Sequence, residues 1–273
     1  MSVVPAVAAA SAGTPLFVAH GIAKRFGGVQ ALADVSFAIP RGSIYGLIGP
    51  NGAGKTSLFN VLTGIYEADG GTFEFDGRPL SGLKPNEVAA RGIARTFQNI
   101  RLFANLSALE NVMIGRHVHT KAGVFGAMLR TRRTLDEERA IEARAFQLLE
   151  YVGVASRAND LARHLAYGDQ RRLEIARALA TEPKLLALDE PAAGMNATET
   201  AGLARLLQDI RADGVTILLI EHDMKLVMSL CDRVLVLDYG RRIAEGPAAQ
   251  VQKDPAVIAA YLGGDVALNL KGA

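Results

Sequence analysis

The sequence contains one complete phosphate-binding pattern, G-x-x-x-x-G-K-[ST], formed by Gly49, Pro50, Asn51, Gly52, Ala53, Gly54, Lys55 and Thr56. An apolar run from Ser43 to Ile48 precedes the pattern and predicts a buried strand, while residues 56–63 predict a short helix that ends at Gly64. This strand–loop–helix order is the context in which the pattern binds phosphate. It predicts that the chain folds around a nucleotide site.

The residue types of this loop suit a bound polyphosphate. Glycines let the backbone approach the anion closely, so that successive N–H groups and the start of the next helix point at it. Lys55 is predicted to reach the β- and γ-phosphates, and the Thr56 hydroxyl to ligate Mg²⁺. A glycine-rich turn without a ligand is the structural alternative, which the Lys-Thr pair and the flanking elements disfavour.

The composition is that of an ordinary globular chain, with 49% hydrophobic and 21% charged residues among 273. The 30 basic and 28 acidic residues leave a formal net charge of +2, which is too balanced to predict a nucleic-acid surface. We therefore expect the local basic clusters to lie on solvated helix faces. These clusters are Arg130, Arg132 and Arg133, and Arg171 with Arg172.

Several features predict a cytosolic protein. Cys231 is the single cysteine, which excludes an intramolecular disulfide, and its apolar neighbours predict a small core residue. No apolar run reaches the roughly 18 residues that a membrane-spanning helix needs. The first residues are rich in Ala, Ser, Val and Pro, without the basic start of a secretory signal, and are expected to form a tail.

The pattern along the chain predicts the fold class. Apolar and polar residues alternate around residues 17–19 and 35–39 and again over 71–77, which predicts antiparallel strands. The apolar runs 185–188, 216–220 and 234–237 predict buried strands, and the helical segments between them are typical of a mostly parallel sheet. The predicted fold is α/β, with a mixed sheet, an antiparallel β subdomain and a helical insert.

The insert is expected at about residues 98–168, where the pattern becomes helical. Ser107 with Glu110, and Thr134 with Glu137, each match the S/T-x-x-E capping box that opens a helix.

Near the end of the chain, Asp254-Pro255 predicts the cap and first turn of a last short helix that ends near Gly263. We therefore divide the chain into a disordered tail (1–14), a nucleotide-binding domain (15–249) and a C-terminal helix and tail (250–273).

Two carboxylates follow the predicted strand 185–188. A buried strand would deliver Asp189 rigidly to the edge of the sheet, where it can hold Mg²⁺ through the water shell of the ion. Glu190 would then lie near the γ-phosphate, where it can orient the attacking water or accept its proton. An Asp-Glu pair after a strand is also typical of a helix cap, and the phosphate loop upstream favours the catalytic interpretation.

Two further residues are candidates because of their position. His222 follows the predicted strand 216–220, at the edge of the sheet where ligands bind, and could donate a hydrogen bond to the γ-phosphate. Gln98 stands where the sheet core gives way to the helical insert, and its amide could contact the metal ion or water when nucleotide is bound.

The segment from Leu165 to Gln170 precedes a strongly helical run from Arg171 to Ala180. A loop of small residues at a helix N-terminus is a second potential anion site. The chain would then have two helix ends that can bind phosphate, but only one nucleotide. This suggests that in a dimer the two phosphate-binding sites close on each other across the interface.

Together these motifs resemble the ATP-binding cassette (ABC) ATPases over nearly the whole chain. The phosphate loop resembles the Walker A motif of that family, Gln98 its Q-loop, 185–189 its Walker B motif, Glu190 its catalytic glutamate and His222 its switch histidine. The resemblance implies ATP and Mg²⁺ as cofactors, with Phe26 stacking on adenine. It also implies that the signature residues contact the nucleotide: Ala166, Tyr167, Gly168 and Asp169.

The segments RTFQNIRLF, LAYGDQRRLEIARAL, LDEPAAGMN, IEHDMKLVM and DPAVIAAYLG look most like the ATP-binding subunits of bacterial branched-chain amino acid importers. The usual Leu-Ser-Gly-Gly-Gln signature is altered, because Ala166 and Tyr167 replace Ser-Gly and Asp169 replaces Gln. Asp169 places a negative charge near an anion, so modest turnover is expected. Asn196 replaces the aspartate that ends the D-loop in the family, and it can still cap a helix.

The resemblance implies an ATPase that energises import and lies on the inner face of the plasma (inner) membrane. Its implied partners are a second ATPase subunit, identical or a sister chain, two membrane permease subunits and, indirectly, a substrate-binding protein. The apolar group Ile100, Leu102, Phe103 and Leu106 is predicted either to contact the permeases or to pack inside the insert. The alternatives are another solute (urea, amides, other amino acids), lipopolysaccharide export, or an ABC factor of translation or repair.

Overall fold

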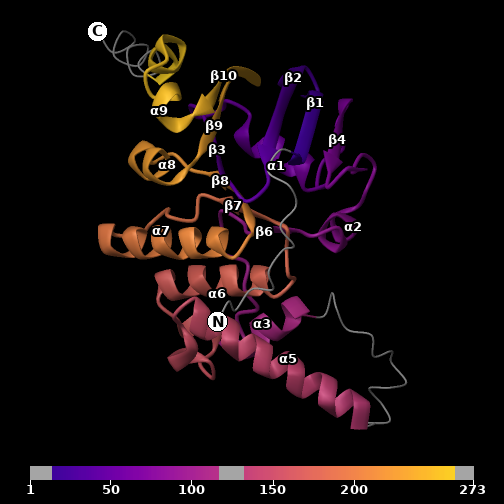
Figure 1. Ribbon diagram of the computed structural model, residues 1–273, viewed down its shortest axis with the longest axis vertical. Coiled ribbons are helices and arrows are strands. Elements are labelled where there is room, and N and C mark those ends of the chain that lie inside the picture. Colours follow the sequence, from indigo (N-terminus) through magenta and orange to yellow (C-terminus); the bar gives the residue numbers. More distant parts are fainter. Residues whose placement is uncertain (1–13, 117–131, 262–273) are drawn as a thin grey trace.

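The structure is a computed structural model that describes residues 14–116 and 132–261 (Figure 1). Two sheets occupy the upper part of the molecule in that view, and helices α3, α5 and α6 form its lower end. The predicted tail 1–14 and the end of the predicted C-terminal helix lie almost entirely outside the described residues.

The first sheet has four antiparallel strands in the order β2-β1-β4-β5. Its strands are β1 (Pro15–Phe26), β2 (Val29–Pro40), β4 (Gly70–Phe75) and β5 (Arg78–Pro79). Buried and more exposed residues alternate along β4, where Phe73 and Phe75 point into the core. Because one face of this sheet is covered, the period-2 pattern of the sequence is visible here.

The second sheet has six strands in the order β10-β9-β3-β8-β7-β6. Its strands are β3 (Ile44–Ile48), β6 (Ile93–Arg95), β7 (Leu185–Asp189), β8 (Thr216–Ile220), β9 (Arg233–Asp238) and β10 (Arg241–Pro247). Five strands are parallel, and β10 is antiparallel to β9. The mixed sheet and the antiparallel subdomain therefore confirm the predicted fold class.

The helices cover both faces of the second sheet and form the lower end of the molecule. They are α1 (Lys55–Leu62), α2 (Pro85–Ala90), α3 (Ala108–Arg116), α5 (Arg132–Tyr151), α6 (Tyr167–Leu179), α7 (Ala197–Ala212), α8 (Met224–Leu230) and α9 (Ala248–Val251). Two short 3₁₀ helices, Ala155–Arg157 and Ala162–His164, lie between α5 and α6. Residues 255–261 form a further helical segment.

The buried strands divide their side chains between two cores. Ile44 and Ile48 of β3 pack in the cluster that includes α3 and α5–α8, whereas Tyr45 and Leu47 pack in the cluster that includes β1, β2, β4 and α1. Successive side chains of a strand point to opposite faces, so an unbroken apolar run fills both layers. The central sheet is thereby fixed between the antiparallel sheet and the helices.

The caps agree with the sequence at two of three positions. Ser107 Oγ accepts the Glu110 N–H at 3.2 Å at the start of α3, and Asp254 Oδ1 accepts the Ala256 N–H at 2.8 Å at the start of the last segment. The predicted cap at Thr134 is wrong, because α5 already includes Arg132. None of the helices within the described residues is both long and apolar enough to cross a bilayer.

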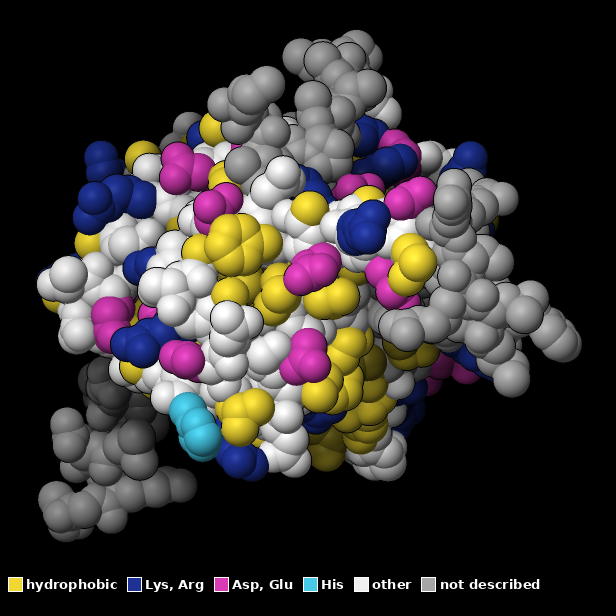
Figure 2. Space-filling model, turned by 90° about the horizontal axis from the view of Figure 1, so that it is seen from below, with side chains coloured by type: hydrophobic (Ala, Val, Ile, Leu, Met, Phe, Trp, Pro, Cys, Tyr) yellow, Lys and Arg dark blue, Asp and Glu magenta, His cyan; other side chains and the backbone are white. Residues whose placement is uncertain are grey.

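The surface of the helical end mixes charges of both signs, as Figure 2 shows from below. The expectation that Arg171 lies on a solvated face is wrong, because its side chain is completely buried. The prediction for Cys231 is confirmed, since it is a free thiol in the core.

Candidate functional site

The phosphate loop connects β3 to α1 and is pressed against the turn between β9 and β10. A Cβ atom on Gly49 would lie 2.2 Å from the Leu237 carbonyl oxygen, and one on Gly54 would lie 2.6 Å from the Ala31 carbonyl oxygen. The Gly240 N–H donates to the Ala53 carbonyl at 3.0 Å from the same side. Glycine is therefore required at Gly49 and Gly54 for the backbone to pass.

Lys55, the first residue of α1, folds back along the loop. Its Nζ donates to the carbonyl oxygens of Gly49 (2.6 Å) and Pro50 (2.9 Å). Burial lowers the pKa of this ammonium group, and the nearby Glu190 and Asp189 carboxylates oppose the shift. The cation is thus held at the loop on weak neutral acceptors, which a phosphate can replace.

A cavity of about 450 Å³ opens over this loop. It collects eight of the predicted site residues: Asn51, Gly52, Ala53, Gly54, Lys55, Thr56, Gln98 and Glu190. Sequence reasoning missed the opposite wall, which is formed by Val29, Gln30, Ala31, Tyr239 and Gly240. The signal for the last two was available, because they directly follow a buried strand at the ligand-binding edge of the sheet.

Asp189 ends β7 and is almost completely buried, at 5% exposure. Burial raises the pKa of its carboxyl group, and the Arg95 guanidinium, with NH2 3.6 Å from Oδ2, opposes that effect. A partly compensated buried carboxylate beside the phosphate loop is a suitable ligand for a hard cation.

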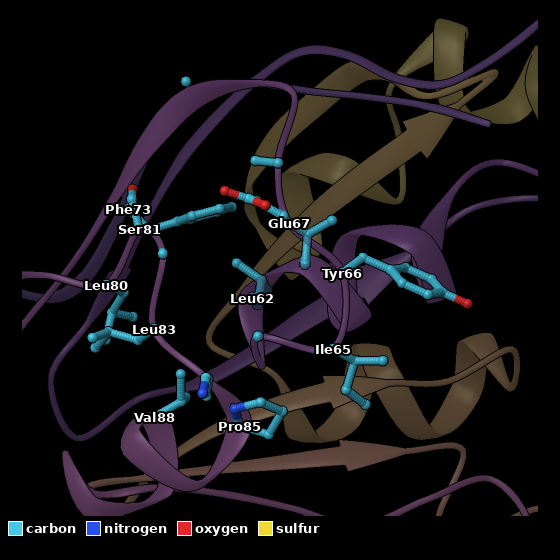
Figure 3. A pocket seen from close by; sticks show the side chains of 16 residues that line it. Leu62, Ile65, Tyr66, Glu67, Phe73, Leu80, Ser81, Leu83, Pro85 and Val88 are labelled. Atoms are coloured by element: carbon cyan, nitrogen blue, oxygen red, sulfur yellow. The ribbon is translucent and has the colours of Figure 1, made fainter. Parts of the chain in front are cut away.

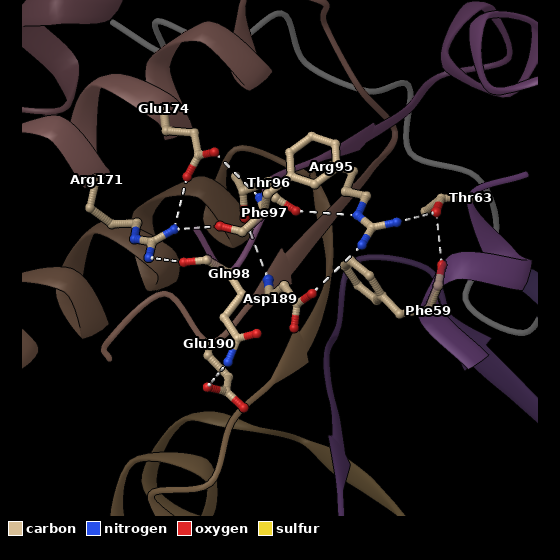
Figure 4. A network of polar contacts seen from close by, with 10 residues as sticks. All are labelled: Phe59, Thr63, Arg95, Thr96, Phe97, Gln98, Arg171, Glu174, Asp189 and Glu190. Carbon is tan, nitrogen blue, oxygen red and sulfur yellow. Dashed lines mark hydrogen bonds and ion pairs between the residues drawn. The ribbon is translucent and has the colours of Figure 1, made fainter. Parts of the chain in front are cut away.

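Arg95 was not identified from the sequence. Its guanidinium lies between the rings of Phe59 and Phe97, at 4.4 and 4.8 Å from their centroids (Figure 4). Its NH1 donates to Thr63 Oγ1 at 2.8 Å. Two aromatic faces and one hydrogen bond fix this cation next to Asp189.

Glu190 stands at the centre of the predicted catalytic residues. Its Oε2 accepts a hydrogen bond from Gln98 Nε2 at 3.0 Å and lies 3.8 Å from His222 Nδ1. Its backbone has φ +47°, a left-handed conformation that is costly for a non-glycine residue. The three side chains that the sequence singled out from distant segments therefore meet at one point.

Glu221 is a second residue that sequence reasoning missed. It is buried at the end of β8, and its two oxygens accept the N–H groups of Ala192 (2.8 Å) and His222 (3.2 Å). Burial raises the pKa of its carboxyl group. Glu221 thus joins the loop after Glu190 to the loop that carries His222.

The signature residues lie at the start of α6, outside the described lining of the cavity. Ala166 is the N-cap, and Tyr167, Gly168 and Asp169 form the first helical turn, so the helix begins four residues earlier than the predicted Arg171. This helix end belongs to the same chain as the phosphate loop but does not complete the cavity over it.

Phe26, at the end of β1, is 42% exposed and is not among the described residues that line the cavity. Its ring packs edge-on against Tyr66 with centroids 5.2 Å apart, and Lys24 Nζ lies 5.5 Å from the ring centroid. Its role in stacking on adenine stays a prediction.

A separate cavity of about 320 Å³ lies between the end of α1, β4 and α2 (Figure 3). Leu62, Phe73, Leu80 and Val88 line it, and none of the predicted site residues does. The predicted phosphate-binding residues therefore lie at the cavity over the phosphate loop and not at this one.

Comparison with known families agrees with this geometry. The sequence profile of the ABC transporter family matches residues 32–193. A second profile, described as Branched-chain amino acid ATP-binding cassette transporter, matches residues 241–267. The chain belongs to the ABC transporter family and is an ATPase of that family.

Its relatives include two proteins named High-affinity branched-chain amino acid transport ATP-binding protein. LivG of Salmonella typhimurium is 46% identical over 250 residues, which cover 91% of this chain and 98% of LivG. BraF of Pseudomonas aeruginosa is 44% identical over the same shares of this chain and of BraF. A solved ATP-binding cassette of an ABC transporter in its ADP conformation has a TM-score of 0.80 and 32% identity, covering 92% of this chain and 99% of that one. These findings confirm the predicted family and fold.

Proposed function

We propose that this chain is the ATP-hydrolysing subunit of an importer of branched-chain amino acids. The convergence of Lys55, Gln98 and Glu190 in one cavity, with Asp189 and His222 beside them, carries the proposal. The solute is supported by the relatives, which are named for branched-chain amino acid transport. The subunit would work on the inner face of the membrane with two permease subunits, which receive solute from a substrate-binding protein.

The residues present fit Mg²⁺ as well as ATP. The described residues contain no group of three or more His, Cys, Asp or Glu side chains suited to a metal ion. Mg²⁺ does not need one, because it keeps several waters and uses phosphate oxygens with one or two protein ligands. Thr56 and Asp189, with Gln98, would hold the ion, which would neutralise charge on the phosphates.

Each remaining residue has a distinct task in hydrolysis. Lys55 would exchange its two carbonyl acceptors for phosphate oxygens. Glu190 would orient the attacking water and accept its proton, while Gln98 and His222 hold the carboxylate and the γ-phosphate in place. The left-handed backbone at Glu190 aims the carboxylate into the cavity and fixes its direction.

Uptake measurements test the solute. A strain that lacks this chain should lose uptake of radiolabelled leucine, isoleucine and valine, and the wild-type gene should restore it. Glu190→Gln serves as the matched control, since it keeps the size of the side chain but should not restore uptake. Intact leucine uptake together with lost urea or amide uptake would assign one of the alternative solutes instead.

We further propose that two subunits close head to tail, so that the signature of one completes the cavity of the other. Lys55→Ala removes the phosphate contact of one chain, and Gly168→Asp puts a charge at a buried position in the first turn of α6. Each homodimer should be inactive at both sites. In a mixed dimer both lesions fall in one site and the other is intact.

Mixing the two variants should therefore restore hydrolysis to about one quarter of the wild-type rate, because half of the dimers are mixed and half of their sites are whole. ATP-driven dimerisation, measured by gel filtration, is scored alongside, since strict cooperativity between the sites would silence turnover. Failure of both measurements would contradict the homodimeric sandwich.

A further inference from the structure

The signature helix α6 carries a buried ion pair. Arg171 and Glu174 lie one turn apart, with NH1 2.9 Å from Oε2, and their side chains are 0% and 1% exposed. Arg172, the next residue, is partly exposed and donates to the Val152 carbonyl at 3.3 Å. Of these two adjacent arginines, Arg171 therefore faces the interior of the molecule.

All other described polar contacts of the pair, apart from one with Tyr167, go to the backbone of the segment 97–101, the Q-loop. Arg171 NH1 donates to the Phe97 carbonyl at 2.7 Å, and NH2 donates to the Gln98 carbonyl at 2.8 Å (Figure 4). Glu174 Oε1 accepts the N–H groups of Phe97 and Arg101, both at 3.3 Å. The pair thus binds backbone carbonyl groups of the Q-loop through Arg171 and backbone N–H groups of the same loop through Glu174.

The same guanidinium also reaches the signature. Arg171 NH2 donates to the Tyr167 hydroxyl at 3.0 Å, and the tyrosine ring lies 5.7 Å from the guanidinium carbon. Tyr167 is the first residue of α6 and is 45% exposed. One nitrogen atom therefore connects the backbone of Gln98, which faces the cavity, to the exposed first turn of the signature helix.

The stability of the fold alone does not explain a buried ion pair at this position. Burying two charges costs desolvation energy that their attraction often fails to repay, and apolar residues of similar volume are frequently as stable. Arg171 Nε is also buried without a hydrogen-bond partner. The polar contacts of the pair thus serve the position of the loop and the helix.

We propose that the Arg171–Glu174 pair is a clamp that fixes the first turn of α6 to the Q-loop and thereby positions the signature for the nucleotide of the second subunit. Arg171 and Glu174 are positioning residues, since neither lines the nucleotide cavity. A shift of Gln98 against nucleotide or a membrane partner is then transmitted to Tyr167 as a rigid displacement. The inference rests on the proposed head-to-tail dimer.

The double variant Arg171→Met/Glu174→Met tests the clamp. It replaces the pair by apolar side chains of similar length, so it should fold. Its melting temperature should be lower than that of the wild type, because four backbone groups of the Q-loop lose their partners. ATP affinity at its own phosphate loop should stay within about twofold, while kcat and ATP-driven dimerisation fall about tenfold or more. Arg172→Met is the matched control and should hydrolyse ATP at the wild-type rate.

A milder variant covers the case in which the double variant fails to fold. Tyr167→Phe removes one hydroxyl from a half-exposed ring and leaves the buried pair in place. It should lower kcat several-fold with unchanged ATP affinity. Wild-type turnover in Tyr167→Phe and in a folded double variant would overturn the proposal.

Mixing with Lys55→Ala then locates the defect. If the clamp positions the signature for the other subunit, the mixed dimer keeps one intact site, and hydrolysis should rise toward the level of the Gly168→Asp mixture. If the clamp served Gln98 in its own site, the remaining phosphate loop would sit beside a displaced Q-loop, and mixing would restore nothing.

The mixture of Gly168→Asp with Lys55→Ala distinguishes a failure of the clamp from a failure of the head-to-tail dimer. Restoration there, with none for the double variant, overturns the clamp and leaves the sandwich standing. If neither mixture restores hydrolysis and ATP drives no dimerisation in either, the sandwich is removed, and the clamp falls with it.

Discussion

At the scale of single residues, the site depends on side chains that are held in unfavourable states. Glu190 adopts a left-handed backbone, Lys55 is a buried cation on neutral acceptors, and Asp189 is a buried carboxylate with Arg95 3.6 Å away. Each state costs free energy in the folded protein. A polyphosphate that enters the cavity can replace the two carbonyl acceptors of Lys55, because a hydrogen bond between two charged groups is stronger than one to a neutral acceptor.

The first prediction concerns Glu190. Glu190→Gln keeps the shape of the side chain but cannot accept a proton, so hydrolysis should fall by roughly 10²–10⁴-fold, as for other positioned acid–base groups. ATP binding should persist, and trapped ATP should hold the dimer closed in gel filtration. Turnover at the wild-type rate would remove Glu190 from the catalytic role.

The second prediction concerns Cys231. Burial raises the pKa of its thiol from 9.0 to about 12, so at pH 8 the folded protein holds ~10³-fold less thiolate than the unfolded chain. A thiol reagent should label the native protein far more slowly than the protein in denaturant. The contribution of this group to stability is complete below about pH 9 and is lost as the pH rises toward 12. Equal labelling rates in both states would contradict the burial of this thiol.

At the scale of elements, sequence patterns predicted the central strands of the second sheet and missed its two edge strands. The buried strands β3, β7, β8 and β9 were predicted because unbroken apolar runs are conspicuous. The helix α2 and the strands β6 and β10 were not, because they are short or carry charged residues such as Arg241 and Arg242. The candidate catalytic residues were predicted from motifs, whereas Arg95, Glu221 and the buried state of Arg171 depend on tertiary neighbours that no local pattern encodes.

The turn between β4 and β5 joins the two sheets through one carboxylate. Asp76 accepts from Lys184 Nζ and from Arg41 NH2, both at 2.5 Å. These two hydrogen bonds, that of Lys184 first, lower the pKa of Asp76. Lys184 directly precedes β7, and Arg41 lies between β2 and β3, so the contact joins three chain segments.

Replacing this carboxylate should weaken the junction. Asp76→Asn keeps a residue that tolerates φ +51° and should lower the free energy of unfolding by about 1 kcal/mol, a modest value because the group is partly exposed. A thermal melt at neutral pH measures the effect. The difference between variant and wild type should shrink as the pH falls below the unfolded pKa of 3.8 and vanish only below the lowered pKa of the folded state, where Asp76 is neutral in both states. A difference that persisted in acid would point to another cause.

At the scale of the whole molecule, an apolar groove is the surface at which we expect a membrane partner to bind. A cavity of about 400 Å³ lies between α2, the Q-loop, α3 and α6, and Phe103 lines it with 49% of its surface exposed. The Arg177 guanidinium lies 5.7 Å from the Phe103 ring. Leu102, which the sequence grouped with Phe103, packs against the core instead.

Phe103→Glu should therefore leave the isolated subunit folded and able to hydrolyse ATP, and should reduce its co-purification with the permease subunits. Exposed Phe146 on α5, mutated to Glu, is the matched control, since it lies outside the described lining of the groove. Normal co-purification of Phe103→Glu would assign the groove to packing alone.

The strand order of the second sheet also determines when, during synthesis of the chain, the phosphate loop can fold. The strand that leads into the phosphate loop, β3, is paired on one side with β8 and on the other with β9, whose residues follow it by more than 160 positions. The Gly240 N–H then closes on Ala53 from the β9–β10 turn. A ribosome must therefore translate nearly the whole domain before the strands and the turn that pack against the phosphate loop exist. A nascent chain that already carries the entire phosphate motif should bind no nucleotide until its last strands emerge.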